Sequence, residues 1–530
     1  MDKVSLKKLP IGEQSFQSLR MENRLYVDKT EHLYNLLNSE KVYFLSRPRR
    51  FGKSLTISTL EAIFRNQRHL FKDLWIDSSD YEWKEYPIIK LDMSVVGKDT
   101  AEILAESLKL SMNTIAKTYA LELKTTQAPS MFAELINALV AKTGEPVAIL
   151  IDEYDDPIIK HVSDTEKADA NRNVLQDFYK IMKSESANLR FVMLTGVSKF
   201  AKTSIFSGLN NLENISMDEK YAALTGYTQE ELEKYFPEYI ERLAKNYSVS
   251  TIEALKQIKY WYNGYHFSTD KHVSVYNPFS TLLLFNAARF KTHWFETGTP
   301  TYLTKLIRRD WLNVQDFEEN IKVSEDALQS YNVEDVPIIP LLYDTGYLTI
   351  KDSSVKNFIT SYVLAYPNFE VRMAFTEHLL KAYSGERVKE SLAIELSEAL
   401  EAGDIDALIS VLRPHFASIP YDVIPKVSEK YFQLVFLLAI RSAAFRVVTE
   451  ERTNSGRIDL LIEIDDKVIV FEFKVDSSAE IALKQIKDKR YYEKFLTASG
   501  KPLKKILLVG INFSSIERNI SEYLTEEIEP

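Results

Sequence analysis

The sequence predicts an α/β protein whose N-terminal half contains a mostly parallel sheet covered by helices. Unbroken apolar runs such as Val147–Ile151 are typical of strands buried on both faces. Helix-like segments with apolar residues every three or four positions separate these runs, so the crossovers are long and the strands parallel. A second series of short strands after residue 445 predicts a further α/β domain at the C-terminus.

Composition limits the chemistry that this chain can perform. The chain has 530 residues, which suggests about three or four domains. It contains no cysteine and only 8 scattered histidines, which excludes disulfides, thiolate nucleophiles and cysteine-based zinc sites. A metal is therefore expected on oxygen ligands, which favours Mg²⁺ or Mn²⁺. The net charge of −10 means that any nucleic-acid site must be a local basic patch.

Nothing in the sequence predicts a membrane partner. No apolar run approaches the roughly 18 residues that a membrane span requires, and residues 1–10 lack the pattern of a secretory signal. We therefore expect a cytoplasmic protein.

A phosphate-binding loop is predicted between an apolar strand, Val42–Ser46, and a helix that runs from Leu55 to Phe64. Backbone N–H groups at a helix start bind phosphate, as does a lysine ammonium, and a serine hydroxyl takes a place on Mg²⁺. The general motif has glycine where this chain has Arg47. The residues expected to bind nucleotide here are Arg49, Arg50, Phe51, Gly52, Lys53, Ser54 and Leu55, with Ser54 also on the metal.

The strand Val147–Ile151 ends in two acids, Asp152 and Glu153. An acid at the carboxyl end of a strand can hold the water shell of Mg²⁺, and a second acid can orient the attacking water. Asp152 is assigned to the metal and Glu153 to water activation. The alternative is that these acids only begin a solvated turn.

The next buried strand, Arg190–Gly196, ends in a hydroxyl. Its position in the strand–helix alternation suits a residue that senses the γ-phosphate, with Thr195 as first candidate and Ser198 as second. A threonine that simply ends a strand before glycine is an equally good interpretation. Ligands bind at the carboxyl ends of parallel strands, where Lys53, Asp152 and Thr195 are all expected.

The loop segment Arg47–Ser54, together with Leu25–Thr30 and Leu150–Asp155, resembles the bacterial and archaeal AAA-ATPase-like family over about residues 6–220. The Arg-Pro-Arg-Arg form of the loop is itself similar to the family pattern. The resemblance implies a P-loop NTPase fold with Walker A and Walker B motifs, bound ATP and Mg²⁺, and a nuclease-like C-terminus. The Arg47 position leaves open whether ATP is hydrolysed quickly or serves as a switch.

A helical lid and a bridging module are expected in the middle of the chain. Thr228 and Glu231 form a capping-box pattern, and Arg308-Arg309 could supply a sensing cation. The aromatic turn Trp261–Phe267 is interpreted as core rather than as a base-stacking platform. Helix, strand, turn, strand and helix between residues 341 and 383 are compatible with a winged-helix module that packs domains. The predicted boundaries are 1–225 for the ATPase-like domain, 226–320 for the lid, 321–420 for the bridging module and 421–530 for the nuclease-like domain.

The C-terminal part predicts a second site. Three strands are expected from Phe445 to Lys474, with a two-residue hairpin at Asp465-Asp466. Alternate strand residues share a face, so Glu472 and Lys474 point together, and the hairpin brings Asp459 opposite them. Two carboxylates beside an ammonium can hold Mg²⁺, activate water and stabilise a phosphodiester transition state. An edge-strand salt bridge is the alternative.

The segments Gly456–Leu460, Phe471–Lys474 and Ala482–Ile486 are similar, in order and spacing, to the PD-(D/E)XK nuclease superfamily over about residues 425–515. The resemblance implies a restriction-endonuclease-like α/β domain in which Asp459 and Glu472 bind metal and Lys474 is the catalytic lysine. It also implies that Gln485 and Tyr491 shape the site, and that Glu429 on the leading helix is a candidate third acid. The predicted helix Ser478–Lys494 carries a row that could follow a phosphate backbone or face solvent: Lys484, Lys487, Lys489, Arg490 and Lys494.

These observations predict an ATP-controlled, Mg²⁺-dependent nuclease with DNA as the expected substrate, and with Mn²⁺ as an alternative metal. The rival is an ATP-switched regulatory protein whose nuclease fold only docks a partner. A third hypothesis, an ATP-driven remodeller of proteins, predicts a homo-oligomeric ring. The protein partner that either rival requires is not identified by the sequence.

Overall fold

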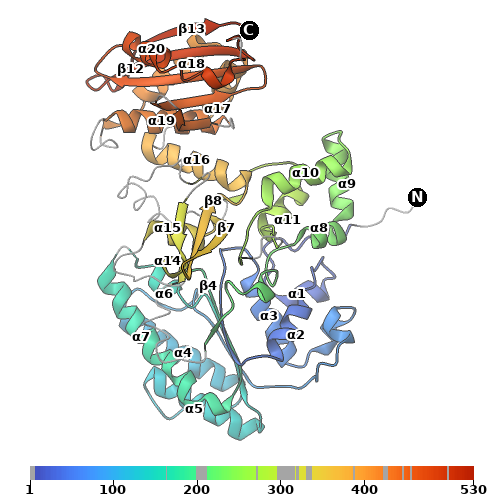
Figure 1. The fold of residues 1–530 in the computed structure, drawn as a ribbon. Coiled ribbons are helices and arrows are strands. Elements are labelled where there is room, and N and C mark those ends of the chain that lie inside the picture. Colours follow the sequence, from blue (N-terminus) through green and yellow to red (C-terminus); the bar gives the residue numbers. More distant parts are fainter. Residues whose placement is uncertain are drawn as a thin grey trace. The chain divides into compact units, whose positions relative to one another are not determined.

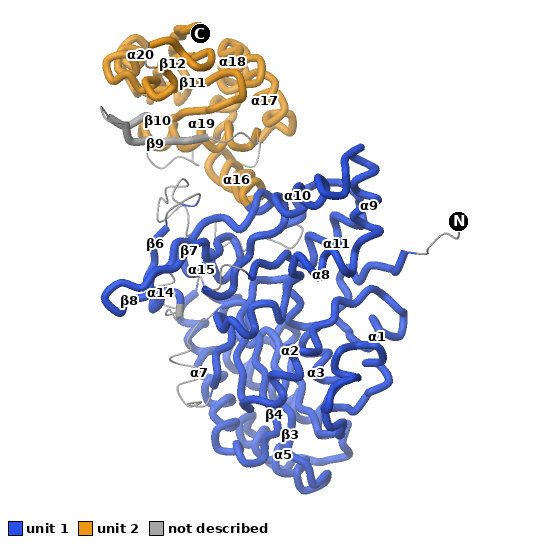
Figure 2. The backbone as a smooth tube through the Cα atoms, turned by 45° about the vertical axis from the view of Figure 1, so that its right-hand side comes forward, with its two compact units in different colours: residues 1–371 blue, residues 372–530 orange. Residues whose placement is uncertain are grey.

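The computed structural model describes residues 6–162, 164–198, 212–269, 273–294, 317, 321–329, 337–385, 388–421, 428–443, 447–453, 456–497 and 500–530, with backbone alone for the residues of 447–458 in that set. The chain divides into two compact units, residues 1–371 and 372–530, which Figure 2 colours separately. Each unit contains its own five-stranded sheet.

The first unit is built on a five-stranded sheet with the order β2-β3-β4-β1-β5, in which every neighbouring pair is parallel. This confirms the predicted parallel sheet. The central strands are apolar and buried along their length, because helices cover both faces. The strands are β1 (Val42–Ser46), β2 (Ile88–Asp92), β3 (Val147–Asp152), β4 (Leu189–Gly196) and β5 (Glu213–Asn214).

Helices form a layer on each side of this sheet (Figure 1). The first group contains α1 (Phe16–Met21), α2 (Thr30–Leu37) and α3 (Lys53–Phe64), and the opposite group contains α4 (Ala101–Thr118), α5 (Ala128–Thr143) and α7 (Thr165–Ser184). A short helix, α6 (Asp156–Ile159), follows β3. The helices predicted at about 100–118, 131–142 and 167–186 are thereby confirmed to within a few residues.

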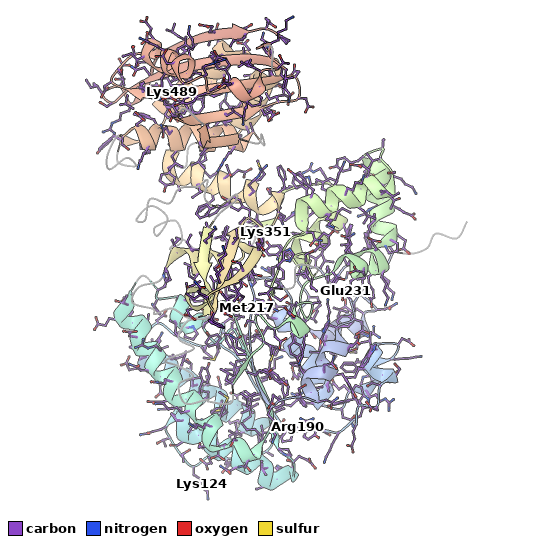
Figure 3. The ribbon with its side chains drawn as sticks, viewed as in Figure 1. Lys124, Arg190, Met217, Glu231, Lys351 and Lys489 are labelled. Carbon is purple, nitrogen blue, oxygen red and sulfur yellow. The ribbon has the colours of Figure 1, made fainter. Side chains whose placement is uncertain are left out.

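Four helices follow the sheet in the chain: α8 (Gln229–Tyr235), α9 (Pro237–Asn246), α10 (Thr251–Tyr262) and α11 (Pro278–Ala287). The predicted capping box forms at α8, where Thr228 and Glu231 satisfy each other's backbone N–H groups. Glu231, labelled in Figure 3, also accepts a 2.6 Å bond from Lys29 Nζ. Tyr262, Tyr265 and Phe267 are buried, which confirms the core interpretation of the aromatic turn.

A three-stranded antiparallel sheet with the order β6-β8-β7 completes the first unit. Its elements are β6 (Ile321–Ser324), α14 (Glu325–Gln329), α15 (Ile338–Asp344), β7 (Thr349–Lys356) and β8 (Ile359–Ala365), followed by α16 (Phe369–Ser384). The helix–strand–turn–strand–helix pattern is present as predicted. The proposed sensing pair Arg308-Arg309 lies outside the described residues, and the boundaries at 225, 320 and 420 stay predictions.

The second unit contains a mixed sheet with the order β13-β12-β11-β10-β9. Only β11 and β12 are parallel, and α20 connects them. The elements are α17 (Leu392–Ala402), α18 (Ile405–Ala417), α19 (Glu429–Ser442), β9 (Val447–Thr453), β10 (Gly456–Glu463), β11 (Lys467–Val475), α20 (Ala479–Asp488), β12 (Lys505–Ser514) and β13 (Asn519–Ile528).

Two features of this unit differ from the prediction. Helix α20 ends at Asp488 and not at Lys494, because Arg490 has a positive φ of 50° and Tyr491 N–H turns back to the carbonyl of Ile486. The edge strand β13 was not predicted, and it carries Glu522, Glu526 and Glu527. Among the described residues of both units, no helix is long and apolar enough to cross a membrane.

Candidate functional sites

The phosphate loop lies where the sequence predicted it, between the end of β1 and the start of α3. Gly52 caps the helix with φ of 93°, a left-handed conformation that a residue with a Cβ adopts only with strain. The loop therefore turns sharply into the helix, and the N–H groups of the first helical turn face outward from the helix end.

Lys53 is buried inside this loop. Its Nζ donates to the carbonyl oxygens of Arg47 at 2.9 Å and Pro48 at 3.1 Å. Burial lowers the pKa of Lys53, while the carboxylates of Asp152 and Glu153 act in the opposite direction. The ammonium is thus held beside the acids at the end of β3.

The two acids that end β3 have different surroundings. Asp152 is buried and accepts a hydrogen bond from the Thr195 hydroxyl, which joins the ends of β3 and β4. Glu153 has a positive φ of 52°, and burial raises the pKa of its carboxyl group. A pKa raised by burial suits a group that accepts a proton from water, because such a base is stronger than an exposed carboxylate.

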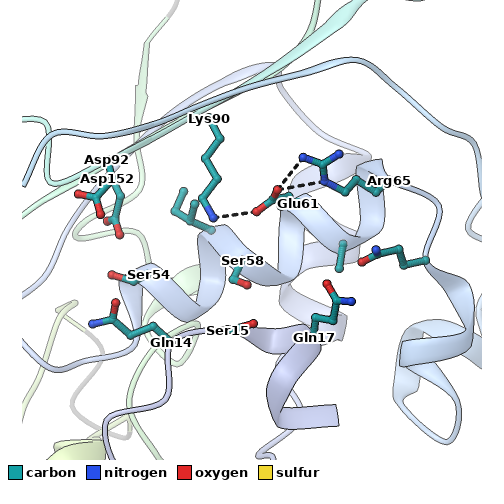
Figure 4. Close-up of a pocket in the computed structure, with 13 residues that line it drawn as sticks. Gln14, Ser15, Gln17, Ser54, Ser58, Glu61, Arg65, Lys90, Asp92 and Asp152 are labelled. Carbon is teal, nitrogen blue, oxygen red and sulfur yellow. Dashed lines mark hydrogen bonds and ion pairs between the residues drawn. The ribbon is translucent and has the colours of Figure 1, made fainter. Parts of the chain in front are cut away.

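Cavities open at this edge of the sheet, and the two described next are both lined by Ser54. The larger, about 360 Å³, is lined by Arg49, Arg50, Gly52, Lys53, Ser54, Leu55 and Glu153 on one side and by Tyr227, Pro278, Phe279 and Leu282 on the other. The second, about 260 Å³, contains Ser54, Asp92 and Asp152 (Figure 4). Ser54 belongs to both, so the loop hydroxyl lies near the Asp152 carboxylate as a magnesium site requires.

The side chains of Arg47 and Phe51 do not line these two cavities, whereas Arg50 lines the larger one. Arg47 is buried and donates to backbone carbonyls, and the Phe51 ring packs against Tyr265 and Phe267 with centroids 4.8 and 5.1 Å away. A role for Phe51 in nucleotide binding would therefore use its backbone and not its ring. Arg50 lies over the Phe279 ring at 4.7 Å.

Sequence reasoning missed two acids near this site. Asp92 ends β2 in register with Asp152, the same strand-end signal that identified Asp152. Asp155 is buried and accepts bonds from the backbone N–H and hydroxyl of Ser198 at 2.7 and 2.6 Å. Ser198, the second sensor candidate, is therefore held by Asp155, whereas Thr195 contacts Asp152.

The residues of the second candidate site lie on the hairpin of β10 and β11, and this hairpin forms as predicted. Ile464 and Lys467 exchange hydrogen bonds across the two-residue turn, and Leu460 pairs with Phe471. Asp459 Oδ2 accepts a 2.8 Å bond from Phe473 N–H, which places it beside the Glu472–Lys474 end of β11.

Glu472 is the centre of this second site. Its Oε1 accepts hydrogen bonds from Lys474 Nζ at 2.9 Å and from Gln485 Nε2, whereas its Oε2 is buried without a hydrogen-bond partner among the described residues. Burial, with a smaller contribution from Asp459, raises the Glu472 pKa to about 7. A buried oxygen with no partner is costly unless a ligand satisfies it. The pair of Asp459 and Glu472 therefore fits a hard divalent cation.

The helices supply the remaining predicted residues. Gln485, on α20, contacts Glu472, and Tyr491 is buried in the core beneath the sheet. The charge of Glu429, at the start of α19, acts on the pKa of both Glu472 and Lys474, so it lies within electrostatic reach of the site. In the basic row, Lys487 pairs with Glu526 and Arg490 with Glu493.

Comparisons with known proteins find two domain families in this chain. A model described as predicted AAA-ATPase matches residues 10–206, and a PD-(D/E)XK nuclease superfamily model matches residues 427–523. An uncharacterized protein in the vnfD 5' region of Azotobacter chroococcum mcd 1 is 36% identical over 542 residues, which cover 99% of this chain and 100% of that protein.

A solved structure, Drosophila ORC bound to poly(dA/dT) DNA and Cdc6, aligns over 82% of this chain and 62% of that chain. Its identity is 12% and its TM-score is 0.26, so neither fold nor function follows from it.

The fold and the family matches together define a P-loop ATPase-like protein with a nuclease-like domain. The chain belongs to the predicted AAA-ATPase family, and its C-terminal part belongs to the PD-(D/E)XK nuclease superfamily. Domains of these kinds generally use a nucleotide and a divalent metal.

Proposed function

We propose that this protein binds and hydrolyses ATP in its first unit and that this reaction controls Mg²⁺-dependent cleavage of DNA by its second unit. The observation that supports the proposal most is the arrangement around Glu472. A buried carboxylate oxygen that has no partner in the described part of the chain lies beside Asp459 and Lys474, which is hard to explain by packing alone.

In the first unit, Lys53 and the N–H groups that begin α3 bind the phosphates, while Ser54 and Asp152 hold Mg²⁺. The metal neutralises charge on the phosphates when it is bound. Glu153 orients the attacking water and takes its proton, and Thr195 fixes the orientation of the Asp152 carboxylate.

In the second unit, Asp459 and Glu472 hold Mg²⁺, for which Mn²⁺ can substitute, and the metal activates water when it is bound. Lys474 orients that water and stabilises negative charge on the phosphodiester in the transition state. Gln485 fixes the Glu472 carboxylate through its side-chain N–H.

The decisive experiment incubates the full-length protein with single- and double-stranded DNA and RNA, with Mg²⁺ or Mn²⁺, and with or without ATP. We expect metal-dependent DNA cleavage that Lys474→Ala abolishes and that ATP alters. Lys501→Ala is the matched control, because this lysine is exposed and lies in the loop before β12. No cleavage of any substrate by the unsubstituted protein would contradict the nuclease assignment.

Nucleotide binding is tested separately by calorimetry with ATP and Mg²⁺. Lys53→Ala should abolish binding, because the buried ammonium in the loop is lost, whereas Lys41→Ala, at an exposed residue just before β1, should bind normally. Retained binding by Lys53→Ala would refute the loop assignment.

One observation favours a second function, an ATP-switched regulatory protein whose nuclease fold docks a partner. Two cations of the basic row, Lys487 and Arg490, are engaged by carboxylates, which reduces the positive charge available to a phosphate backbone. This function predicts normal ATP hydrolysis together with no cleavage in the experiment above.

A further inference from the structure

The first residue of the phosphate loop is a fully buried arginine. Arg47 is 1% exposed, and its Nη1 donates to the carbonyls of Ser46 at 3.0 Å and Ser216 at 2.6 Å. Its Nη2 donates to the carbonyl of Tyr221 at 3.2 Å. One side chain thereby joins the loop to the segment after β5, at the neighbouring edge of the sheet.

No carboxylate neutralises this guanidinium within the described part of the chain. Arg47 has no ion pair there, its Nε has no hydrogen-bond partner, and the charged group lies 4.2 Å from the centroid of the Phe267 ring. Burial lowers the pKa of Arg47 to about 10, which leaves the side chain protonated at neutral pH. A buried charge without a counter-ion is costly, so an anion that approaches it is strongly favoured.

The backbone of Arg47 lies at the candidate phosphate site, because its carbonyl oxygen accepts the hydrogen bond from Lys53 Nζ at 2.9 Å. Its side chain extends from there to the carbonyls of Ser216 and Tyr221. We infer that Arg47 is a positioning residue whose fixed charge is compensated by the polyphosphate of the bound nucleotide, without direct contact. The inference rests on the nucleotide site proposed above. It explains why arginine can stand at a glycine position: the side chain points into the protein, away from the space that the phosphates need.

Coulombic attraction grows with the charge of the ligand, so Arg47 should favour a nucleoside triphosphate over a diphosphate. Two substitutions separate its charge from its hydrogen bonds. Arg47→Lys keeps the charge but has fewer donors, and Arg47→Gln keeps an amide donor but loses the charge. Arg47→Met is a second neutral variant, in case the glutamine variant does not fold.

The experiment measures the dissociation constants of Mg²⁺-bound ADP and of a non-hydrolysable ATP analogue by calorimetry on the full-length protein. We expect the neutral variants to weaken the ATP analogue by about tenfold or more and ADP by less, while Arg47→Lys keeps the unsubstituted ratio of the two constants. All variants should lower the melting temperature without nucleotide, because carbonyl bonds are lost. A neutral variant with an unchanged ratio, or Arg47→Lys with a reduced one, would overturn the inference and leave only a structural role.

Lys53→Ala in the same assay keeps the two proposals distinguishable. If it binds nucleotide normally, the nucleotide site itself is misassigned. If it loses binding while a neutral Arg47 variant keeps the unsubstituted ratio, only the role of Arg47 fails.

Discussion

Glu472 carries the strongest pH dependence expected at the second site. Its pKa is raised to about 7 by burial and by Asp459, so the metal-free folded protein keeps this proton at pH values where the unfolded chain, with a pKa near 4.5, has lost it. The folded state binds more protons in that window, so the Glu472 contribution to stability is full below about pH 4.5 and is lost as pH rises through 7. Melting temperatures in chelator at pH 5.5 and 7.5 should therefore fall more for the unsubstituted protein than for Glu472→Gln.

The matched control is Glu480→Gln, on the exposed first turn of α20, which should follow the unsubstituted protein. Parallel curves for the unsubstituted protein and Glu472→Gln would mean that Glu472 does not titrate in this range. The same ionisation should make Mg²⁺ affinity rise about tenfold per pH unit below 7, because the metal needs the carboxylate.

Glu153 gives a prediction at the first site. Glu153→Gln keeps the shape of the side chain and loses the basic oxygen, so we expect ATP to bind within about threefold of normal and to be hydrolysed at least about 100-fold more slowly. Phosphate release measures turnover, and Glu166→Gln, exposed on the first turn of α7, is the control. Unchanged turnover would remove the proposed role of Glu153 as base.

At the residue scale, the sequence predicted side chains whose relation is local. Glu472 and Lys474 share a face because strands alternate, and a two-residue hairpin fixes Asp459 opposite them. The orientation of Arg47 was not predictable, because its carbonyl partners Ser216 and Tyr221 lie about 170 residues away in the chain. The hydrogen bonds from Ser198 to Asp155 depend in the same way on the pairing of two strands, β3 and β4, that are distant in the sequence.

At the scale of elements, the contact of α20 with β12 positions Gln485. A Cβ on Gly510 would lie 2.4 Å from the Ala479 carbonyl oxygen and 2.6 Å from the Leu483 nitrogen. Both are backbone atoms of α20. Gly510→Val should displace the helix, destabilise the unit by about 1–3 kcal/mol and weaken the hydrogen bond from Gln485 to Glu472. Denaturant unfolding and metal affinity measure the two effects.

The control for that prediction is Thr525→Ala on the exposed strand β13. We expect its stability to change by less than about 0.5 kcal/mol. If Gly510→Val unfolds at the same denaturant concentration as Thr525→Ala, the close approach of α20 to β12 is not rigid.

Helices with a clear periodicity of apolar residues were predicted well. A strand that forms only because a neighbouring strand pairs with it was not. The helices α4 and α7 have clear apolar periodicity, and their predicted bounds of 100–118 and 167–186 hold to within two residues. Strand β13 is mostly polar and exposed on one side, so it has little apolar signal and exists because β12 pairs with it.

At the scale of the molecule, two compact units predict two separable unfolding transitions. With Mg²⁺ present in every sample, a non-hydrolysable ATP analogue at about 100 times its dissociation constant should stabilise the first unit by about 2.7 kcal/mol. Differential scanning calorimetry should show one transition shift in the unsubstituted protein and no shift in Lys53→Ala. A single transition, or two that shift together, would mean that the units unfold cooperatively.

Whether neighbouring strands run parallel or antiparallel in each sheet was predictable from the length of the chain segments that connect them. Long helical crossovers require parallel strands in the first unit, and short turns allow antiparallel ones in the second. The predicted boundaries at 225, 320 and 420 stay predictions, and the two compact units divide after residue 371.

The acidic edge strand β13 affects how the protein can be shortened. Its neighbour β12 is apolar and buried along most of its length, while β13 faces outward with Glu522, Glu526 and Glu527. Charged side chains on an edge strand discourage a second chain from adding to the sheet. Deleting the chain after Ser514 would leave the backbone N–H and C=O groups along one edge of β12 unpaired. Another chain could then pair with this edge, so shortened proteins should precipitate during expression even where both candidate sites are intact.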